Sequence, residues 1–238
     1  MTRALAAILL AACATARPEV LTADRTDRDK AQDSWRKPAE LLSFCGPPAG
    51  GHVADLGAGG GYSTELWARA VGPKGAVYAQ NPPAWDGDWV QKVWGPRLAK
   101  PAMANTSYQF LPWETPLPPK AQQLDAVYSV AVYHDVINEK GDAAKMNKAV
   151  FDALKSGGVY CIVDNSAKDG SGAADVGKLH RVDEALVRQQ VTEAGFRLAG
   201  DAAFLRNAND PRDWNADPGA KDPRSHTQDR FVLRFEKP

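Results

Sequence analysis

The sequence predicts an α/β fold with a doubly wound, mostly parallel, seven-stranded sheet and an antiparallel strand at one edge. Short apolar runs typical of buried strands alternate with amphipathic helical segments along most of the chain. A glycine-rich turn joins the first of these runs to a helix. The last apolar run follows its predecessor through a loop that has no helical pattern, which indicates an antiparallel strand.

The composition is that of an ordinary globular protein. The 238 residues suffice for one α/β domain, and 44% of them are hydrophobic. Lys plus Arg and Asp plus Glu both count 29, so the formal net charge is zero. This balance argues against a basic nucleic-acid-binding protein, and we expect no nucleic-acid partner. No apolar run approaches the roughly 20 residues that a membrane-spanning helix requires.

Residues 1–16 have the pattern of an export signal. Arg3 precedes an apolar run over residues 4–14, which is too short to be a stable transmembrane anchor. Within it, Leu10-Ala11-Ala12-Cys13 resembles the lipobox of bacterial lipoproteins, and this resemblance implies a periplasmic protein attached to a membrane only through a lipid on Cys13. Ala14-Thr15-Ala16 favours the alternative, cleavage by ordinary signal peptidase.

The two remaining cysteines are Cys45 and Cys161. Neither has the spacing of a metal ligand. Cys161 falls in an apolar, strand-like run, and Cys45 comes shortly before the first predicted strand. We expect two separate buried thiols, with a disulfide in an oxidising compartment as the alternative.

The polar residues 17–37 are expected to form a helical arm ahead of a domain spanning residues 38–238. Helices are predicted where Pro38 suits a first turn, where apolar residues recur at helical spacing, and where Asp183 can cap and Gly195 can stop a helix. The predicted helices are 38–44, 62–71, 142–154 and 183–194. The predicted strands are 52–56, 76–79, 108–111, 124–132, 159–163, 196–198 and 230–235.

Three segments do not fit a simple strand–helix alternation. Residues 82–104 contain Trp85, Trp89 and Trp94 around an expected helix, and these side chains form either an acceptor wall or ordinary packing against the sheet. Residues 165–179 are expected to be a glycine-rich loop. Residues 207–228 are expected to be an exposed excursion before the last strand.

The glycine turn is the most specific motif. It reads Asp55-x-Gly57-x-Gly59-x-Gly61 and lies between a predicted strand and a predicted helix. Small residues let a ligand approach the backbone there, and the helix offers free N–H groups. The dinucleotide fingerprint requires Gly or Ala at position 62, where this chain has Tyr62. A nicotinamide-dependent enzyme is therefore disfavoured.

The segment 53–62 resembles the first motif of class I S-adenosylmethionine (SAM)-dependent methyltransferases, and residues 154–159 resemble their turn before the fifth strand. The resemblance covers residues 38–238 and implies the Rossmann-like methyltransferase fold. The chain is most similar to a group of exported bacterial predicted methyltransferases. Their shared motifs appear here as Ala23-Asp24-Arg25, Tyr133-His134-Asp135 and Leu179-His180-Arg181-Val182-Asp183.

The resemblance implies SAM as the cofactor. Gly57, Gly59 and Gly61 would surround its methionine portion, and Asp55 would anchor the turn or the amino group. Position 81 normally bears an acid for both ribose hydroxyls, but Asn81 brings an acceptor without charge. The implied cofactor-binding residues are Asp55, Gly57, Gly59, Gly61, Tyr62, Asn81, Trp113 and Glu114. Trp113 either stacks on adenine or is an aromatic at the edge of the core.

The candidate catalytic residues are Tyr133, His134 and Asp135, directly after the fourth strand. His134 is expected to accept a proton with Asp135 orienting it, or else to cap the strand end. His180 and Arg181 either close over a substrate or, as we expect, form a surface turn.

We expect no metal site. Asp164-Asn165 resembles the metal-binding pair of catechol-type O-methyltransferases, but the third ligand of that set would fall near Val130, which cannot bind a metal.

The sequence thus predicts SAM-dependent methyl transfer to a small molecule. The alternative is a methyltransferase-like module at the cell envelope that binds a ligand without catalysis. Two observations favour the alternative: SAM is made in the cytoplasm whereas the chain carries an export signal, and Asn81 replaces the expected acid.

Overall fold

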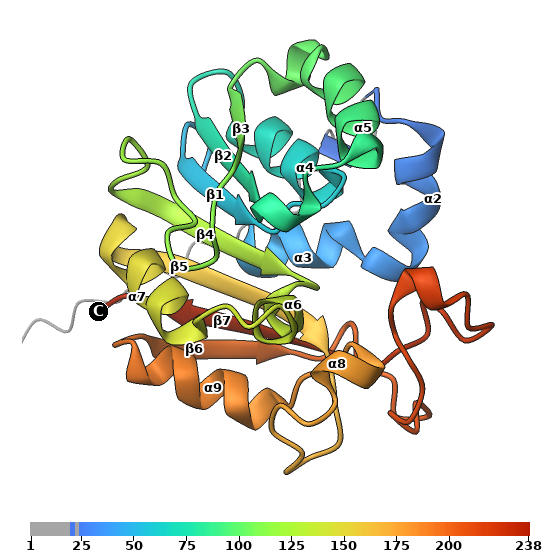
Figure 1. Cartoon of the computed structure of the whole chain (residues 1–238). Helices are drawn as coiled ribbons and strands as arrows, with labels where there is room; N and C mark the ends of the chain where they lie inside the picture. The colour runs from blue at the N-terminus through green and yellow to red at the C-terminus, as the bar shows by residue number, and fades with distance from the viewer. Residues whose placement is uncertain (1–19, 22–23) are drawn as a thin grey trace, which may run out of the picture.

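The computed structural model describes residues 20–21 and 24–238, which contain a seven-stranded sheet of order β3-β2-β1-β4-β5-β7-β6 (Figure 1). The strands β1 to β5 pair in parallel, and β7 is antiparallel to both β5 and β6. The predicted fold class is confirmed. The strands are β1 His52–Leu56, β2 Ala76–Asn81, β3 Thr106–Phe110, β4 Leu124–Val130, β5 Leu154–Asn165, β6 Arg197–Ala202 and β7 Arg230–Glu236.

Helices cover both faces of this sheet (Figure 1). Within the described part of the chain they are α2 Asp27–Arg36, α3 Pro38–Cys45, α4 Tyr62–Val71, α5 Asp88–Leu98, α6 Tyr133–Asn138, α7 Ala143–Ala153, α8 Val176–Leu179 and α9 Glu184–Glu193. Single 3₁₀ turns occur at Pro83–Trp85, Pro101–Met103 and Pro218–Ala220. The predicted cap Asp183 is confirmed, because its carboxylate accepts a hydrogen bond of 2.9 Å from the backbone N–H of Ala185.

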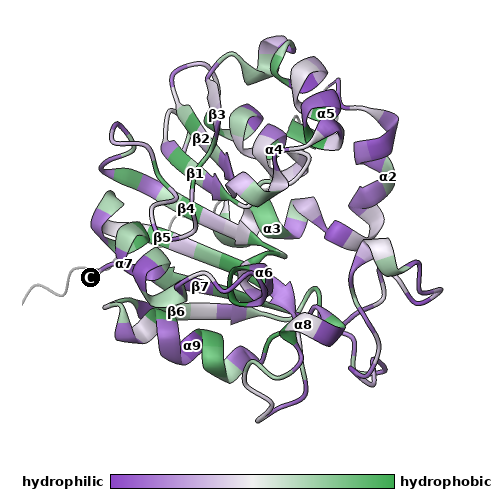
Figure 2. Ribbon diagram, viewed as in Figure 1, coloured by the Kyte–Doolittle hydropathy of each residue, from purple (hydrophilic) through white to green (hydrophobic). Residues whose placement is uncertain are grey.

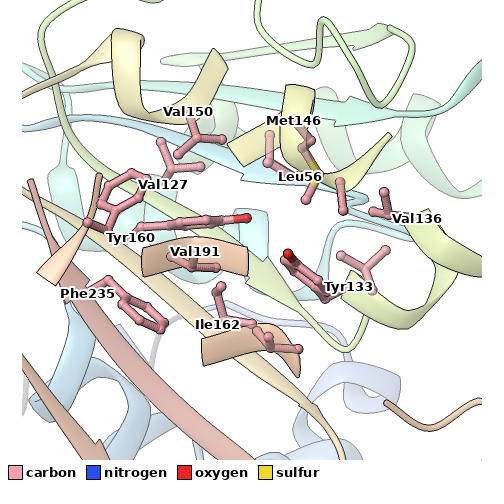
Figure 3. Packing of buried hydrophobic residues seen from close by; sticks show 14 of the residues in the cluster. Leu56, Val127, Tyr133, Val136, Met146, Val150, Tyr160, Ile162, Val191 and Phe235 are labelled. Carbon is pink, nitrogen blue, oxygen red and sulfur yellow. The ribbon is translucent and has the colours of Figure 1, made fainter. Parts of the chain in front are cut away.

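The alternation of side chains along β1 separates two hydrophobic cores. Val53 packs in the core beneath α3 and α4, whereas Ala54 and Leu56 pack in the core beneath α7 and α9. Figure 3 shows the second core, in which Tyr133 and Tyr160 lie among aliphatic side chains. Each face of the sheet is therefore buried, as a parallel sheet requires.

The structure corrects the prediction at two chain turns. The short helix α6 begins shortly after β4, where the sequence predicted a strand as far as residue 132 and no helix before residue 142. The strand β5 begins at Leu154, so the predicted turn over residues 155–158 lies inside the strand, with an irregular register against β4 near Leu124. At this irregularity β5 has extra residues relative to β4, and they include the glycines that the sequence pattern assigned to a turn.

Most of the segment 207–228 is exposed, as expected, but a few of its residues are buried against the domain. Trp214 and Ala216 are each only 3% exposed. His226 stacks on Trp35 of α2, with ring centroids 4.1 Å apart and planes inclined by 16°. The end of this segment thus lies against the N-terminal arm, as Figure 1 shows for the blue and red parts of the chain.

Cys45 and Cys161 form a disulfide, so the expectation of two separate thiols was wrong. Cys45 ends α3, and Cys161 lies on the face of β5 that α3 covers. The hydroxyl of Tyr128 donates a 2.8 Å hydrogen bond to the carbonyl of Cys45, which fixes the end of the helix over the sheet. Nothing in the spacing of 116 residues between the two cysteines predicts this meeting.

The arm that precedes the domain contains α2, which Figure 2 shows as mostly hydrophilic. Ion pairs hold it: the Arg97 guanidinium binds the carboxylates of Asp29 at 2.9 Å and of Glu65 at 2.5 Å. The predicted export signal over residues 1–16 and its Cys13 lie outside the described residues. No helix in the part of the chain described is long and apolar enough to cross a membrane.

Candidate functional site

A cavity of about 410 Å³ lies at the carboxyl ends of β1, β4 and β5. Its walls include the glycine turn after β1, the arm helix α2, the segment after β2, the start of α6, the residue after α8 and the segment before β7. The lining residues include Trp35, Arg36, Asp55, Gly57, Gly59, Tyr62, Trp85, Trp89, His134, Asp135, His180, Asp217, His226 and Arg230. The volume is in the range of small-molecule sites.

The glycine turn has the backbone that its sequence predicts. Gly57 and Gly59 have φ values of 57° and 55°, in the left-handed region that favours glycine. A Cβ on Gly57 would lie 2.2 Å from Cγ2 of Val132, so only glycine fits there. At Gly59 nothing lies within 4 Å of the position of a Cβ. The turn therefore presents bare backbone at the cavity.

Asn81 stabilises this turn and does not line the cavity. Its side-chain oxygen accepts a 2.8 Å hydrogen bond from the N–H of Gly59, and its Nδ2 donates to the Gly59 carbonyl at 3.0 Å and to the Tyr108 hydroxyl at 2.9 Å. The Nε1 of Trp94 also donates to the Gly59 carbonyl, at 2.7 Å. Asn81 is fully buried, so every polar atom of its amide is used inside the protein.

Trp113 and Glu114 also lie outside the cavity wall. Trp113 is 4% exposed and donates from Nε1 to Glu139 at 2.8 Å. Glu114 accepts a 2.9 Å hydrogen bond from the backbone N–H of Asp142, at the start of α7. Trp85 and Trp89, which follow β2, do line the cavity, as does Trp35 of α2. Trp94 instead is buried and stacks on Tyr108.

Asp55 and Tyr62 line the cavity as the resemblance implies. Asp55 accepts a 2.5 Å hydrogen bond from the hydroxyl of Thr64 in the first turn of α4. Burial raises the pKa of this carboxyl to about 7, although the bond from Thr64 opposes the rise. The Tyr62 hydroxyl donates to Asp33 of α2 at 2.7 Å, which joins the glycine turn to the arm.

His134 is held by a carboxylate that the sequence did not associate with it. Its Nδ1 lies 2.6 Å from Oδ1 of Asp164, and its backbone N–H donates to Oδ2 of the same residue at 2.9 Å. Asp164 ends β5 and is fully buried. Burial alone would lower the pKa of His134, but the charge of Asp164 outweighs it and raises the pKa to about 9. The orienting carboxylate of His134 is therefore Asp164.

Asp135 faces the other nitrogen of this ring. Its Oδ1 lies 3.3 Å from Nε2 of His134 and 3.7 Å from Nδ1 of His180. His180 lines the cavity, so the expectation of a surface turn was wrong for it. Its backbone is left-handed, with φ of 50°, and the Asn165 side chain donates to its carbonyl at 3.0 Å. In the sequence, only the motif over residues 179–183 indicated a role for His180. The fold is what places His180 beside His134.

The neighbours of these two histidines are structural. Tyr133 is fully buried, and its hydroxyl bonds with Gln190 at 3.0 Å and Asn147 at 2.8 Å in the core of Figure 3, away from the cavity. Arg181 is fully buried and donates to Asp210 at 2.7 Å and to the carbonyls of Ser166 and Trp214. These hydrogen bonds connect the segment that follows β6 to the end of β5.

Two arginines that no sequence motif indicated, Arg36 and Arg230, also line the cavity. The guanidinium carbons of Arg36 and Arg230 lie 4.6 Å and 5.5 Å from the ring centroid of Trp35. Neither forms an ion pair with a carboxylate of residues 20–21 or 24–238, and Nε of Arg230 is buried without a hydrogen-bond partner there. Burial and the charge of Arg36 lower the pKa of Arg230 to about 10. Two cationic side chains that face the same ring and form no ion pair within these residues suit a negatively charged ligand group.

Comparison with known proteins identifies the fold of the chain and nothing beyond the fold. No family model and no curated protein matches the chain. Solved structures match it along most of its length. A SAM-dependent methyltransferase from Aquifex aeolicus has 16% identity and a TM-score of 0.62, over 89% of this chain and 98% of that one.

Two other matches show what this fold holds elsewhere. Fibrillarin from Aeropyrum pernix, in complex with natively bound SAM, has 14% identity and a TM-score of 0.54, over 85% of this chain and 76% of that one. The [4+2]-cyclase SpnF has 11% identity and a TM-score of 0.61, over 87% and 82%. The chain therefore has the Rossmann-like fold of SAM-dependent class I methyltransferases, a fold that also carries other reactions.

Proposed function

We propose that this protein transfers the methyl group of SAM to a small molecule bound in the cavity. One observation carries the proposal. On a sheet with the methyltransferase fold, the glycine turn lines the same cavity as Arg36 and Arg230, two arginines that form no ion pair with a carboxylate of the described residues. In open α/β sheets ligands bind beyond the carboxyl ends of the strands, where this cavity lies.

The residues present fit the methionine end of SAM. Its carboxylate would bind Arg36 and Arg230, neither of which forms an ion pair with a carboxylate of the described residues. Its chain would run along the backbone of the glycine turn at Gly59, where no side chain lies within 4 Å of the position of a Cβ. When bound, SAM supplies an electrophilic methyl group.

The ribose end differs from the family pattern. Asn81 binds the backbone of Gly59 and the hydroxyl of Tyr108, so it has no free polar atom for ribose hydroxyls. The adenosine portion would then lie toward Trp85 and Trp89, which line the cavity after β2. Aromatic faces suit an adenine ring.

The acceptor would bind beside His134 and Asp135, at the far side of the glycine turn. Both residues line the cavity, and Asp164 and Asp135 fix the His134 ring from either side. The residues would thereby hold the acceptor in a fixed orientation, which is the main demand of an in-line displacement. The cavity volume and the zero net charge favour a small acceptor over a nucleic acid.

The test is calorimetric titration of the purified chain with SAM, for the unmodified protein and for Arg36→Gln. We expect saturable binding to the unmodified protein and about tenfold weaker binding to Arg36→Gln, because a charged hydrogen bond to the carboxylate is lost. Arg197→Gln is the matched control, since this arginine lies on β6 and pairs with Glu236 at 2.7 Å.

Two outcomes would overturn the proposal. No binding at millimolar SAM would favour the alternative, a methyltransferase-like module that does not use this cofactor. Equal affinities of the unmodified protein and Arg36→Gln would remove the arginine pair from the cofactor site, and with it the observation on which the proposal rests.

We also propose that the protein works outside the cytoplasm, in the periplasm, attached through a lipid on Cys13. The disulfide between Cys45 and Cys161 supports this location, because disulfides persist in oxidising compartments. The signal pattern over residues 1–16 is the second support.

A further inference from the structure

Three side chains in the cavity offer metal-ligand atoms that face one another. One such atom from each of His134, Asp135 and His180 lies within 4.8 Å of the other two. The Asp135 carboxylate stands between the rings, 3.3 Å from Nε2 of His134 and 3.7 Å from Nδ1 of His180. In a tetrahedral zinc site with bonds of about 2.1 Å, two ligand atoms are about 3.4 Å apart. These two distances match that edge.

The other nitrogen of each histidine lies near a carboxylate, and at His134 the two are within hydrogen-bond distance. Nδ1 of His134 lies 2.6 Å from Asp164, and Nε2 of His180 lies 3.9 Å from Asp217. Histidines that bind a metal through one nitrogen usually donate from the other to a carboxylate, which fixes the tautomer and the orientation of the ring. The His134 ring therefore has the carboxylate partner that is usual for a metal-binding histidine, and Asp217 places a negative charge near the His180 ring.

Asp164 itself cannot be a ligand. Its Oδ2 accepts from the N–H of His134 at 2.9 Å, and its Oδ1 accepts from the N–H of Asn165 at 2.6 Å and faces the His134 ring. Asp164 therefore cannot take the ligand role that it would have in the catechol-type pair Asp164 and Asn165. The ligand atoms lie one layer nearer the cavity.

The charge of the cluster suits a cation. Three carboxylates, those of Asp135, Asp164 and Asp217, surround two imidazoles that are neutral when they bind a metal. Exposure of the side chains rises from 5% at His134 to 17% at Asp135 and 23% at His180, so the cluster is reached from the cavity.

We propose that His134, Asp135 and His180 bind a divalent transition metal ion of the zinc type. Two histidines and one carboxylate suit Zn²⁺ or Fe²⁺, and not Mg²⁺ or Ca²⁺, which prefer oxygen ligands. Three protein ligands leave a coordination position free, as in catalytic zinc sites. That position faces the cavity and would take an oxygen or nitrogen donor of the bound small molecule.

The test uses the full chain freed of metal and titrated calorimetrically with Zn²⁺ in the absence of SAM. We expect one Zn²⁺ per chain, and about tenfold or greater weakening in Asp135→Asn and in His180→Asn. Asparagine suits position 180 because it tolerates the left-handed backbone there. His226→Asn is the matched control: His226 lines the same cavity with φ of 77°, but it stacks on Trp35 outside the cluster.

A second measurement separates ligation from a change in folding. Co²⁺ bound to the unmodified protein should give a visible absorption spectrum that His180→Asn loses and His226→Asn keeps. Asp217→Asn, whose side chain is 40% exposed, should weaken Zn²⁺ binding without loss of thermal stability.

The absence of Zn²⁺ binding to the unmodified protein would overturn the metal site. So would equal Zn²⁺ affinity of the unmodified protein, Asp135→Asn and His180→Asn. Because no SAM is present in the titration, a protein that fails to bind SAM can still confirm the metal site, and the reverse also holds.

Discussion

At the scale of single residues, Asn81 has a role other than the ribose binding that the methyltransferase resemblance implies for position 81. An acid there would repel the carbonyl of Gly59, which Asn81 instead binds through its Nδ2. The same amide accepts from the N–H of Gly59, which a carboxylate would also do. Only an amide satisfies both groups at once, so residue 81 stabilises the glycine turn.

Asp55 gives a prediction of pH dependence. Its pKa in the folded protein is about 7, because burial disfavours the charged form, against about 3.9 in an unfolded chain. The folded state therefore holds a proton between these values that the unfolded state has lost. The contribution of Asp55 to stability thus falls as pH rises from about 4 to about 7.

Asp55→Asn removes this titration and keeps an acceptor for the Thr64 hydroxyl. We expect the free energy of unfolding of the variant, relative to the unmodified protein, to rise over this pH range by about 4 kcal/mol at most. Urea unfolding at several pH values measures it. Asp125→Asn is the control of opposite sign: burial opposes the shift, but Lys155 and the N–H of His52 lower the pKa of Asp125. A pH-independent difference for Asp55→Asn would contradict the prediction.

At the scale of elements, α2 matters because it forms one wall of the cavity. Trp35 and Arg36 line the cavity from its last turn. The helix is mostly polar, so ion pairs rather than an apolar face attach it to the domain. Asp29 is the deepest of these contacts, with its side chain 4% exposed against Arg97.

We expect Asp29→Asn to release α2 selectively. The substitution removes the charge that faces Arg97 and should cost about 2 kcal/mol, since hydrogen bonds between charged groups are the strong ones. Hydrogen exchange of the amides of residues 27–36 should accelerate while exchange in β1 stays slow. Asp27→Asn is the matched control, because Asp27 starts the same helix with its side chain fully exposed. Similar exchange in the two variants would show that the ion pair does not hold the helix.

The short helix α6 could not be predicted from the pattern of apolar residues. The apolar run from Leu124 extends past the end of β4 at Val130, because the residues after it are buried in the same core. A helix of six residues has too few turns to show a helical period. The sequence therefore indicated the residues His134 and Asp135 without the helix that carries them.

At the scale of the whole molecule, the disulfide joins the first helix of the domain to the middle of the sheet. It closes a loop of 116 residues, and such long loops lose much entropy in the unfolded chain when they are closed. We expect reduction to lower the free energy of unfolding by about 4 kcal/mol. Urea unfolding with and without reductant measures it.

The control is the double variant Cys45→Ala, Cys161→Ala, whose unfolding should not respond to reductant. If the unmodified protein unfolds at the same urea concentration with and without reductant, the bond does not contribute to stability.

The sequence alone determined the order of the main strands and helices and the position of the glycine turn. These features depend on local periodicity, on turn residues and on glycines such as Gly57, which can adopt the left-handed backbone of the turn. Each of them is a property of neighbouring residues in the sequence. The antiparallel last strand followed from the missing helix before it.

Only the tertiary structure decided which residues share the cavity. Arg36 and Arg230 are separated by almost the whole domain, as are Cys45 and Cys161 by 116 residues, and His180 meets His134 only because β5 returns to the same sheet edge as β4. Such meetings depend on the packing of helices over the sheet, which no local pattern encodes. The physical reason is that side-chain chemistry is written in the sequence, whereas the distance between two side chains is set by the fold.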